Sequence, residues 1–321
     1  MMLCPDGGLR GLMFPNAFEV IRGPRWVPGG EGGNTVCRSE VTSVCVSKQS
    51  RFGNSVKQFR NAVNLASHLG VRNLYLPSFT WIVPGESVSE AGFNIVNDAG
   101  RVYADESTIL IGRLFFDVAG IDRRHKRSAF DVIRQHKDIL SLPVEQASLP
   151  EGHLVIHIRS GDVFVDPVPV RYGQLPLSFY LRVIESRDWR SIYLVAEDER
   201  NPVIRKLLEL LSRRPGFSAC IGRTLEEDLA LLFRATNLVV SNGTFCRAIS
   251  AISGNLKNVY TFEGKYDRWG NRGVEVFNFI DKGRVYANAI LDGNWKNNAE
   301  QLELMLTYPE REIEQERQPL N

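Results

Sequence analysis

The stretch His153–Asp162 constrains the fold of this chain more than any other, because an apolar run passes there directly into a polar corner. Side chains alternate between the two faces of a strand, so His157 and Arg159 are predicted to share one face. Gly161 permits a sharp turn and a close approach of a ligand, and Asp162 places a carboxylate just beyond it. Ligands of open α/β sheets bind outside the carboxyl ends of strands, so the pattern predicts a site for a phosphate-bearing ligand. It fits equally a strand end where Arg159 and Asp162 form a surface salt bridge.

The first half of the chain carries the pattern of a βαβ unit. Residues 41–46 are rich in β-branched side chains and are predicted to form a strand. Apolar side chains then recur at helical spacing from residue 56 to residue 66, and Gly70 ends the predicted helix. Residues 74–76 follow as a second strand. This order favours an α/β domain with a parallel sheet.

A glycine corner lies between the first strand and its helix. Gly53 and Asn54 precede the predicted helix, and backbone N–H groups at a helix start attract anions. A simple N-cap by Asn54 or Ser55 is the commoner use of such residues, and it remains the alternative.

The second half continues to alternate between strands and helices. Strands are predicted at 192–196 and 237–240, and helices at 177–184, 203–211, 225–233 and 245–252. Ser178 is the expected N-cap of the first of these helices, and Thr224 with Glu227 fits a capping box. The corner 241–244, Ser-Asn-Gly-Thr, again presents N–H donors at a helix start.

Proline and glycine punctuation before the central strand predicts two domains. The expected division is an irregular lead-in over 1–40, an N-terminal α/β domain over 41–150 and a C-terminal one over 151–321.

Composition excludes several classes of protein. A net charge of +2 over 321 residues argues against a nucleic-acid binder, and the basic run 123–127 is interpreted as a solvated face. No run of eighteen apolar residues occurs, so no membrane span is expected. The chain as written is expected to be cytoplasmic, or to belong in the Golgi or secretory lumen if an N-terminal anchor was removed. Its five cysteines form no C-x-x-C pair, so neither a metal site nor a disulfide framework is expected.

Four motifs in order resemble one family of enzymes. They are His157-x-Arg159-x-Gly161-Asp162, Leu177-Ser178-x-Tyr180, Asp228-Leu229 and Asn242-Gly243-Thr244-Phe245. Together they resemble the GDP-fucose-dependent fucosyltransferases of the α1,2 type, with their α1,6 and protein O-fucosyl relatives. The loop Phe52-Gly53-Asn54 with Gln58 resembles the opening motif of the α1,2 group.

The resemblance implies a fold and a set of roles. The fold is of the GT-B type, an α/β architecture in which two Rossmann-like domains face each other across the active-site cleft. Arg159 would contact the donor pyrophosphate, with His157 beside it, and Asp228 would hold the nucleoside. The remaining donor-binding residues would be Gly53, Asn54, Asn242, Gly243, Thr244 and Phe245.

The chain also departs from the family. Ser160 stands where relatives often carry a second arginine, and Cys246-Arg247 follows Phe245 where the α1,2 group commonly has a tryptophan pair. The second feature is nearer the α1,6 relatives.

The expected activity is transfer of fucose from GDP-fucose to a hydroxyl group of a glycan acceptor, with inversion and without a metal or other cofactor. Arg159 and His157 would stabilise the departing diphosphate, and Asp162 is the chosen general base, with Asp166 as the other candidate. Two alternatives remain: the same fold with another GDP- or UDP-sugar donor, and a non-catalytic nucleotide- or glycan-binding protein.

Overall fold

The chain forms two compact units, 1–142 and 143–321. The computed structural model describes residues 2–3, 8–10, 18–22, 36–37, 41–98, 108–118, 121–144, 146–264, 266–267 and 269–316. The division precedes the boundary predicted at residues 150 and 151, because the connecting segment binds the second unit. The Leu149 N–H donates to the Arg234 carbonyl at 2.7 Å, and the Thr236 hydroxyl donates to the Leu149 carbonyl at 2.5 Å.

A mostly parallel sheet forms the centre of the first unit. Its strand order is β3-β9-β5-β6-β8-β7, in which β9, β5, β6 and β8 run parallel and the edge strands β3 and β7 run antiparallel. The strands are β3 Phe18–Arg22, β5 Val41–Val46, β6 Asn73–Leu76, β7 Gly85–Val88, β8 Asn94–Asn97 and β9 Thr108–Gly112. The predicted βαβ unit is therefore confirmed in β5 and β6.

The predicted helix after the first strand is α1, Phe52–Leu69, and it begins earlier than its apolar spacing indicates. Gly70 ends it in the left-handed conformation, with φ of 78°. The N-cap is Arg51, so the prediction that Asn54 or Ser55 caps this helix is wrong. The Ser55 hydroxyl instead accepts a hydrogen bond from the Trp81 indole at 2.7 Å.

Part of the expected lead-in forms strands. The strand β3 pairs with β9, which would otherwise leave an unpaired edge. Three shorter strands, β1 Met2–Leu3, β2 Gly8–Arg10 and β4 Val36–Cys37, form an antiparallel sheet of their own. Cys4 lies outside the described residues.

The second helix of the first unit is shorter than predicted. The sequence indicates a helix from residue 128 to residue 142, whereas α2 spans Ala129–Gln135 with Ser128 as its N-cap. Short 3-10 turns, η2 Arg123–His125 and η3 Lys137–Ile139, lie on either side of it.

The second unit is built on a seven-stranded sheet with the order β12-β11-β10-β13-β14-β15-β16. Every neighbouring pair is parallel except β15 with β16. The strands are β10 His153–His157, β11 Ser191–Ala196, β12 Phe217–Ile221, β13 Asn237–Val239, β14 Asn258–Phe262, β15 Glu275–Asp281 and β16 Ile313–Gln315.

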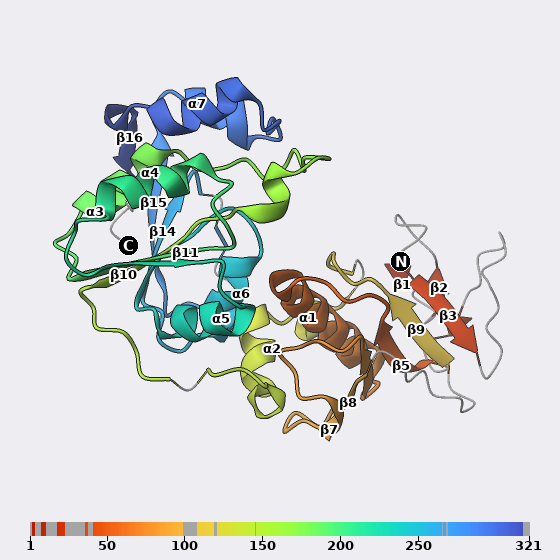
Figure 1. Cartoon of the computed structure of the whole chain (residues 1–321). Helices are drawn as coiled ribbons and strands as arrows, with labels where there is room; N and C mark the ends of the chain where they lie inside the picture. Colours follow the sequence, from red (N-terminus) through yellow and green to blue (C-terminus); the bar gives the residue numbers. More distant parts are fainter. Residues whose placement is uncertain are drawn as a thin grey trace. The chain divides into compact units, whose positions relative to one another are not determined.

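Helices cover both faces of this sheet. Figure 1 shows α3 and α4 on one face and α5 and α6 on the other. The helices are α3 Leu177–Glu185, α4 Pro202–Leu211, α5 Leu225–Arg234, α6 Phe245–Ile252 and α7 Ala299–Thr307. From β10 the chain moves outward through β11 to β12 and then returns to β13 on the other side of β10. The sheet is therefore doubly wound, and its switch point lies between β10 and β13.

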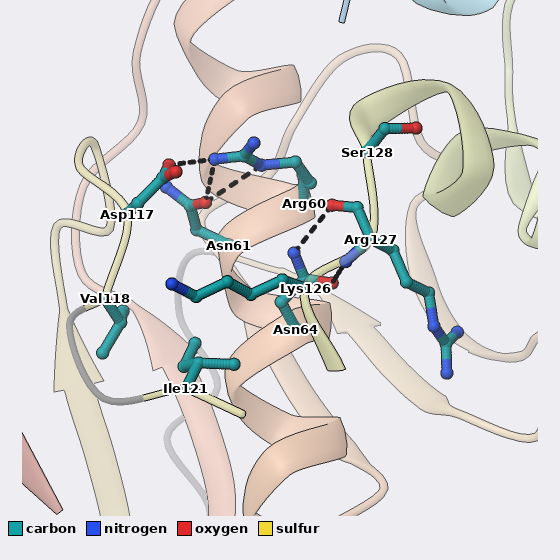
Figure 2. Close-up of a pocket in the computed structure, with 9 residues that line it drawn as sticks. All are labelled: Arg60, Asn61, Asn64, Asp117, Val118, Ile121, Lys126, Arg127 and Ser128. Carbon is teal, nitrogen blue, oxygen red and sulfur yellow. Dashed lines mark hydrogen bonds and ion pairs between the residues drawn. The ribbon is translucent and has the colours of Figure 1, made fainter. Parts of the chain in front are cut away.

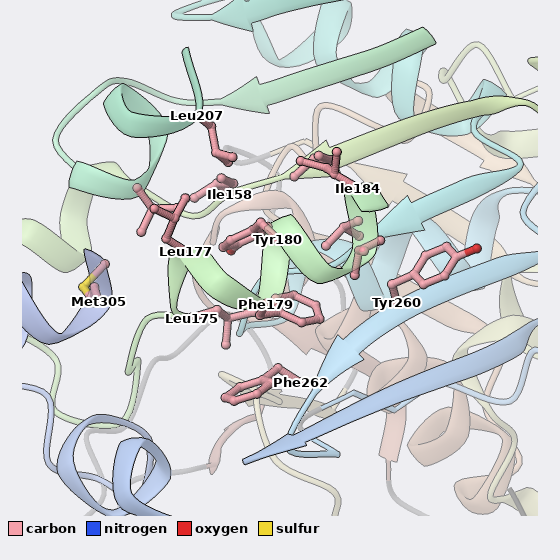
Figure 3. Packing of buried hydrophobic residues seen from close by; sticks show 14 of the residues in the cluster. Ile158, Leu175, Leu177, Phe179, Tyr180, Ile184, Leu207, Tyr260, Phe262 and Met305 are labelled. Carbon is pink, nitrogen blue, oxygen red and sulfur yellow. The ribbon is translucent and has the colours of Figure 1, made fainter. Parts of the chain in front are cut away.

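Helix α3 supplies the centre of the hydrophobic core of the second unit (Figure 3). Phe179 is fully buried, and its ring centroid lies 5.5 Å from the rings of both Phe262 and Phe279. Phe179, Val183 and Ile184, which the sequence spacing places on one inward face of this helix, are all buried, but Ser178 is not its cap. The helix begins directly after Pro176, and Ser178 is buried inside it.

The two units confirm the expected α/β fold class with two sheets that are mostly parallel. No helix within the described ranges is long and apolar enough to cross a membrane.

Candidate functional site

The predicted polar corners of the second unit lie at the switch point of its sheet. His157 ends β10, and the corner 241–244 connects β13 to α6. Because β10 and β13 are adjacent and parallel, both corners emerge at the same carboxyl edge. Doubly wound sheets bind ligands outside the carboxyl ends of their strands at a switch point of this kind.

His157 connects the two corners directly. Its Nδ1 lies 2.8 Å from Ser241 Oγ and 3.3 Å from Cys246 Sγ, and its ring stacks on Phe245 with centroids 4.9 Å apart. Burial, and then the charge of Arg159, lowers the pKa of His157 to about 3. At neutral pH the imidazole is therefore uncharged, and it can support an anion only as a hydrogen-bond donor.

Arg159 supplies the positive charge of this corner. Its guanidinium carbon lies 4.0 Å from the centroid of the Tyr172 ring, and its side chain is 20% exposed. The stacked aromatic ring holds the planar guanidinium in one orientation. Tyr172 is a residue that the sequence analysis missed, because nothing in the loop pattern 166–174 indicates which side chain turns toward Arg159.

Asp162 lies beside Arg159. Its carboxylate oxygens lie 3.3 Å and 3.5 Å from Arg159 Nη2, and its side chain is 42% exposed. The salt bridge between Arg159 and Asp162 that the sequence allows therefore forms. It lies at the same sheet edge as the predicted ligand site. Gly161 has the positive φ, 69°, that the predicted sharp turn requires.

Gly243 makes the close approach of the two corners possible. A Cβ atom at this position would lie 2.6 Å from Arg159 Nη1, and the backbone has φ of 136°. A larger residue would have to displace the guanidinium, so glycine is required here on two counts. Asn242 binds the neighbouring loop, with Nδ2 donating to the Gly173 carbonyl at 3.4 Å. Thr244 is the N-cap residue of α6.

A buried network holds the loop that carries Arg159. Ser160 is buried and donates to the Asp198 carboxylate, which also accepts the Gly161 N–H at 3.3 Å. Asn201 donates from Nδ2 to the Arg159 carbonyl at 3.0 Å, and its N–H donates to Ser160 Oγ at 3.1 Å. The Ser160 hydroxyl is thus one of the groups that hold this loop in place.

Burial of Asp198 would by itself raise the pKa of its carboxyl group. The hydrogen bonds from Ser160, Arg200 and Gly161 outweigh that effect and lower the pKa of Asp198 below its ordinary value. Asp198 and Asn201 are further positions that sequence reasoning missed, although an acidic run, Glu197-Asp198-Glu199, directly follows β11.

Asp228 lies in the first turn of α5, after a complete capping box between Thr224 and Glu227. The helix follows β12, so this turn begins at the same carboxyl edge of the sheet. The Asp228 side chain is 14% exposed, and its Oδ1 has no hydrogen-bond partner among the described residues. Burial raises the pKa of Asp228 to about 6, against the lowering effect of Arg223, whose Nε forms an ion pair with the same Oδ1 at 3.8 Å.

A buried carboxylate oxygen without a hydrogen bond destabilises the folded protein unless a ligand donates one to it. The Oδ1 atom of Asp228 can therefore accept a further hydrogen bond.

Gly53 and Asn54 belong to the first turn of α1 in the first unit. Their predicted contact with the donor stays a prediction. Gln58, which belongs to the same motif, has a structural role, since its Nε2 donates to the carbonyls of Lys48, at 3.2 Å, and Arg113.

The cysteine thiols of the described side chains, Cys45, Cys220 and Cys246, are free. Within the described ranges no group of three or more His, Cys, Asp or Glu side chains has an arrangement that would hold a metal ion.

No protein-family model matches the chain, and no curated protein sequence matches it. Among solved structures it is similar to POFUT1 in complex with GDP in one crystal form, with a TM-score of 0.43 and 12% identity over 69% of this chain and 98% of that chain. A high-resolution structure of the same complex has a TM-score of 0.42 and 12% identity, covering 70% of this chain and 98% of that chain. A putative UDP-N-acetylglucosamine 2-epimerase from Listeria monocytogenes has a TM-score of 0.30 and 9% identity, covering 66% and 63%. These are loose similarities of fold.

Proposed function

We propose that the chain is an inverting glycosyltransferase that moves fucose from GDP-fucose to a hydroxyl group of a glycan acceptor. The observation that carries this proposal is the meeting of Arg159, His157 and the corner 241–244 at the switch point of a doubly wound sheet. The order of the motifs resembles that of the fucosyltransferases, and this resemblance supports GDP-fucose as the donor.

Arg159 would bind the diphosphate of the donor and stabilise the charge that develops as the bond to the sugar breaks. Its orientation is fixed beforehand by Tyr172 and Asp162. Fixed donors that face a developing charge make a large contribution to catalysis, and Arg159 brings this charge without a metal ion. His157, which is neutral, would add one N–H donor beside it.

Asp228 would accept hydrogen bonds from the nucleoside of the donor. A guanine base presents N–H groups on its Watson–Crick edge, and the unsatisfied Oδ1 of Asp228 is a matching acceptor. Asn242, Gly243, Thr244 and Phe245 would border the phosphates.

Asp162 is the proposed general base that takes the proton from the acceptor hydroxyl, because it is exposed and lies at the same corner. Direct attack opposite the departing diphosphate would invert the configuration at the sugar carbon. Gly53 and Asn54 are proposed to complete the donor contacts.

Replacing Arg159 tests the proposal. Arg159→Ala is expected to lower transfer from GDP-fucose by about 10²–10³-fold, the effect of removing one charge-stabilising donor. Transfer is measured with a mixture of glycan acceptors, donor hydrolysis is followed in parallel, and circular dichroism reports the fold. Turnover like that of the wild type in a folded Arg159→Ala protein would contradict the proposal.

Gly243→Ala supplies a second variant, which keeps Arg159 but displaces its guanidinium. It is expected to weaken GDP binding by about tenfold, or about 1.4 kcal/mol. The matched control is Gly254→Ala, because a Cβ at Gly254 meets nothing within 4 Å. A panel of GDP- and UDP-sugars in the same binding assay identifies the donor. A chain that binds them but neither hydrolyses nor transfers the sugar is a binding protein.

A further inference from the structure

The first unit contains a pocket that the proposed donor site does not use. It lies between α1 and the segments 113–118 and 121–128, and Figure 2 shows the side chains around it. Its lining residues are Arg60, Asn61, Asn64, Asp117, Val118, Ile121, Lys126, Arg127 and Ser128.

Two buried amides on α1 hold the walls of this pocket. Asn61 Nδ2 donates to the carbonyls of Leu114 and Phe116 at 2.8 Å and 3.0 Å. Asn64 Nδ2 donates to the Arg127 carbonyl at 3.0 Å and Asn64 Oδ1 accepts the Arg127 N–H at 3.2 Å. Both loops are therefore fixed to the helix by buried hydrogen bonds, so the pocket is a built feature of the unit.

The charge of the lining is positive. The lining contains three basic residues, Arg60, Lys126 and Arg127, and a single acidic residue, Asp117. The Arg60 guanidinium binds Asp117 and Asn61, and Arg127 donates to Gln135. Figure 2 shows the Arg127 guanidinium turned away from the pocket. The available cation is therefore Lys126.

The Lys126 side chain extends across the pocket (Figure 2), and within the described part of the chain its amino group has no ion-pair partner. Val118 and Ile121 make the floor beside it apolar, which strengthens the attraction between an ammonium group and an anion. Arg60 can turn from the exposed Asp117 toward a second oxygen of such an anion.

The size of the pocket limits its ligand. Its volume is about 280 Å³, just below the ~300–1,000 Å³ of sites for drug-sized molecules. A pocket of this size suits an oxyanion on a small carrier. We infer that this pocket binds an oxyanion, a sulfate or phosphate group, between Lys126 and Arg60.

The test is calorimetric titration with sodium sulfate and sodium phosphate at constant ionic strength. All variants are made in an Arg159→Ala background, so that the guanidinium of the corner in the second unit contributes no anion binding, and any remaining contribution of that corner is the same in every variant. We expect millimolar binding of sulfate in this background. Lys126→Gln is expected to weaken it about tenfold, because a charge-assisted hydrogen bond is lost. The matched control, Lys137→Gln, removes an exposed lysine that does not line the pocket and should change nothing.

Asp117→Asn changes binding in the opposite direction. It removes the acidic competitor for Arg60, so sulfate is expected to bind several-fold more tightly. Equal affinities for the two lysine variants, or no sulfate binding at all, would overturn the inference, as would weaker binding by Asp117→Asn.

A second arm distinguishes a free anion from one carried on a sugar. N-acetylglucosamine 6-sulfate is compared with free sulfate and with N-acetylglucosamine. Tighter binding of the sulfated sugar than of the free ion, with the same loss in Lys126→Gln, indicates a glycan-borne ester. Equal affinities indicate a site for the free anion.

Discussion

His157 and Asp228 are both partly shielded from water at the carboxyl edge of the second sheet, and burial favours the uncharged form of each. The pKa of His157 falls to about 3, and the pKa of Asp228 rises to about 6. His157 is therefore neutral at pH 7, whereas Asp228 is charged there at the expense of stability. Within the corner formed by residues 157–162 and 241–245, Arg159 is the main source of positive charge for a diphosphate.

Asp228→Asn is expected to stabilise the protein at pH 8. The pKa of Asp228 is raised from 3.8 to about 6, so burial of this carboxylate is without penalty below about pH 4 and becomes fully unfavourable above about pH 6. A shift of about two pKa units corresponds to at most about 3 kcal/mol of stability at pH 8. Urea unfolding at pH 5 and pH 8 measures the gain, which should be larger at pH 8.

The control for this prediction is Glu226→Gln, a change of an exposed carboxylate in the same helical turn. It should leave the unfolding free energy nearly unchanged at both pH values. If Asp228→Asn raises the free energy of unfolding no more at pH 8 than at pH 5, the buried carboxylate does not destabilise the protein. Asp228→Asn should also weaken GDP binding while it stabilises the protein. This combination separates a ligand-binding role of Asp228 from a structural one.

At the scale of elements, the corner after β10 is held from the start of α4. Asn201 accepts the Val203 N–H at 3.0 Å as the N-cap of α4 and also donates to the Arg159 carbonyl. A single side chain thus starts a helix and fixes the loop that carries the guanidinium. This double use explains why Asn201 is buried, whereas the N-cap residues Thr224 and Asn298 are exposed.

Asn201→Ala is expected to destabilise the protein by about 2–4 kcal/mol, because a cap is lost and buried polar groups are left unpaired. It should also weaken GDP binding, since the Arg159 loop loses its support. Asn298→Ala is the matched control. Asn298 is the N-cap of α7, accepts the Gln301 N–H at 2.9 Å and is exposed.

The control variant should lose about 1 kcal/mol, with unchanged GDP binding. Urea unfolding and calorimetry measure both quantities in both variants. Equal effects of the two substitutions on GDP binding would show that Asn201 acts as an ordinary cap.

At the scale of the whole molecule, each unit has its own sheet and its own buried side chains. The residues of the candidate site in the second unit, His157, Arg159, Asp228 and the corner 242–245, all belong to residues 143–321. The connecting segment from residue 146 also binds this unit. The second unit therefore contains everything that the core of the proposed donor site requires.

The fragment 143–321 is expected to fold cooperatively and to bind GDP without the first unit. Circular dichroism with urea unfolding checks the fold, and calorimetry checks the binding. Introducing Arg159→Ala in the fragment should abolish that binding. A folded fragment that binds no GDP would show that the donor site as assigned here is incomplete.

Local signals in the sequence were sufficient for many of the elements. The β-branched run at 41–46, the stop at Gly70 and the capping box at Thr224 each depend on neighbouring residues, and each is confirmed. The caps expected at Ser55 and Ser178 are wrong. The Ser55 hydroxyl accepts a hydrogen bond from Trp81 instead, and Ser178 is buried within a helix that begins one residue earlier, at Leu177.

By itself the sequence determined the α/β class and the polar corners, because both follow from periodicity and from residues a few positions apart. Only the tertiary structure decided which corners meet. His157 reaches Ser241 across 84 positions of the chain, and Gly243 reaches Arg159 because β10 and β13 are neighbours in the sheet. Strand order follows from how the whole unit buries its apolar faces, and no local pattern encodes it.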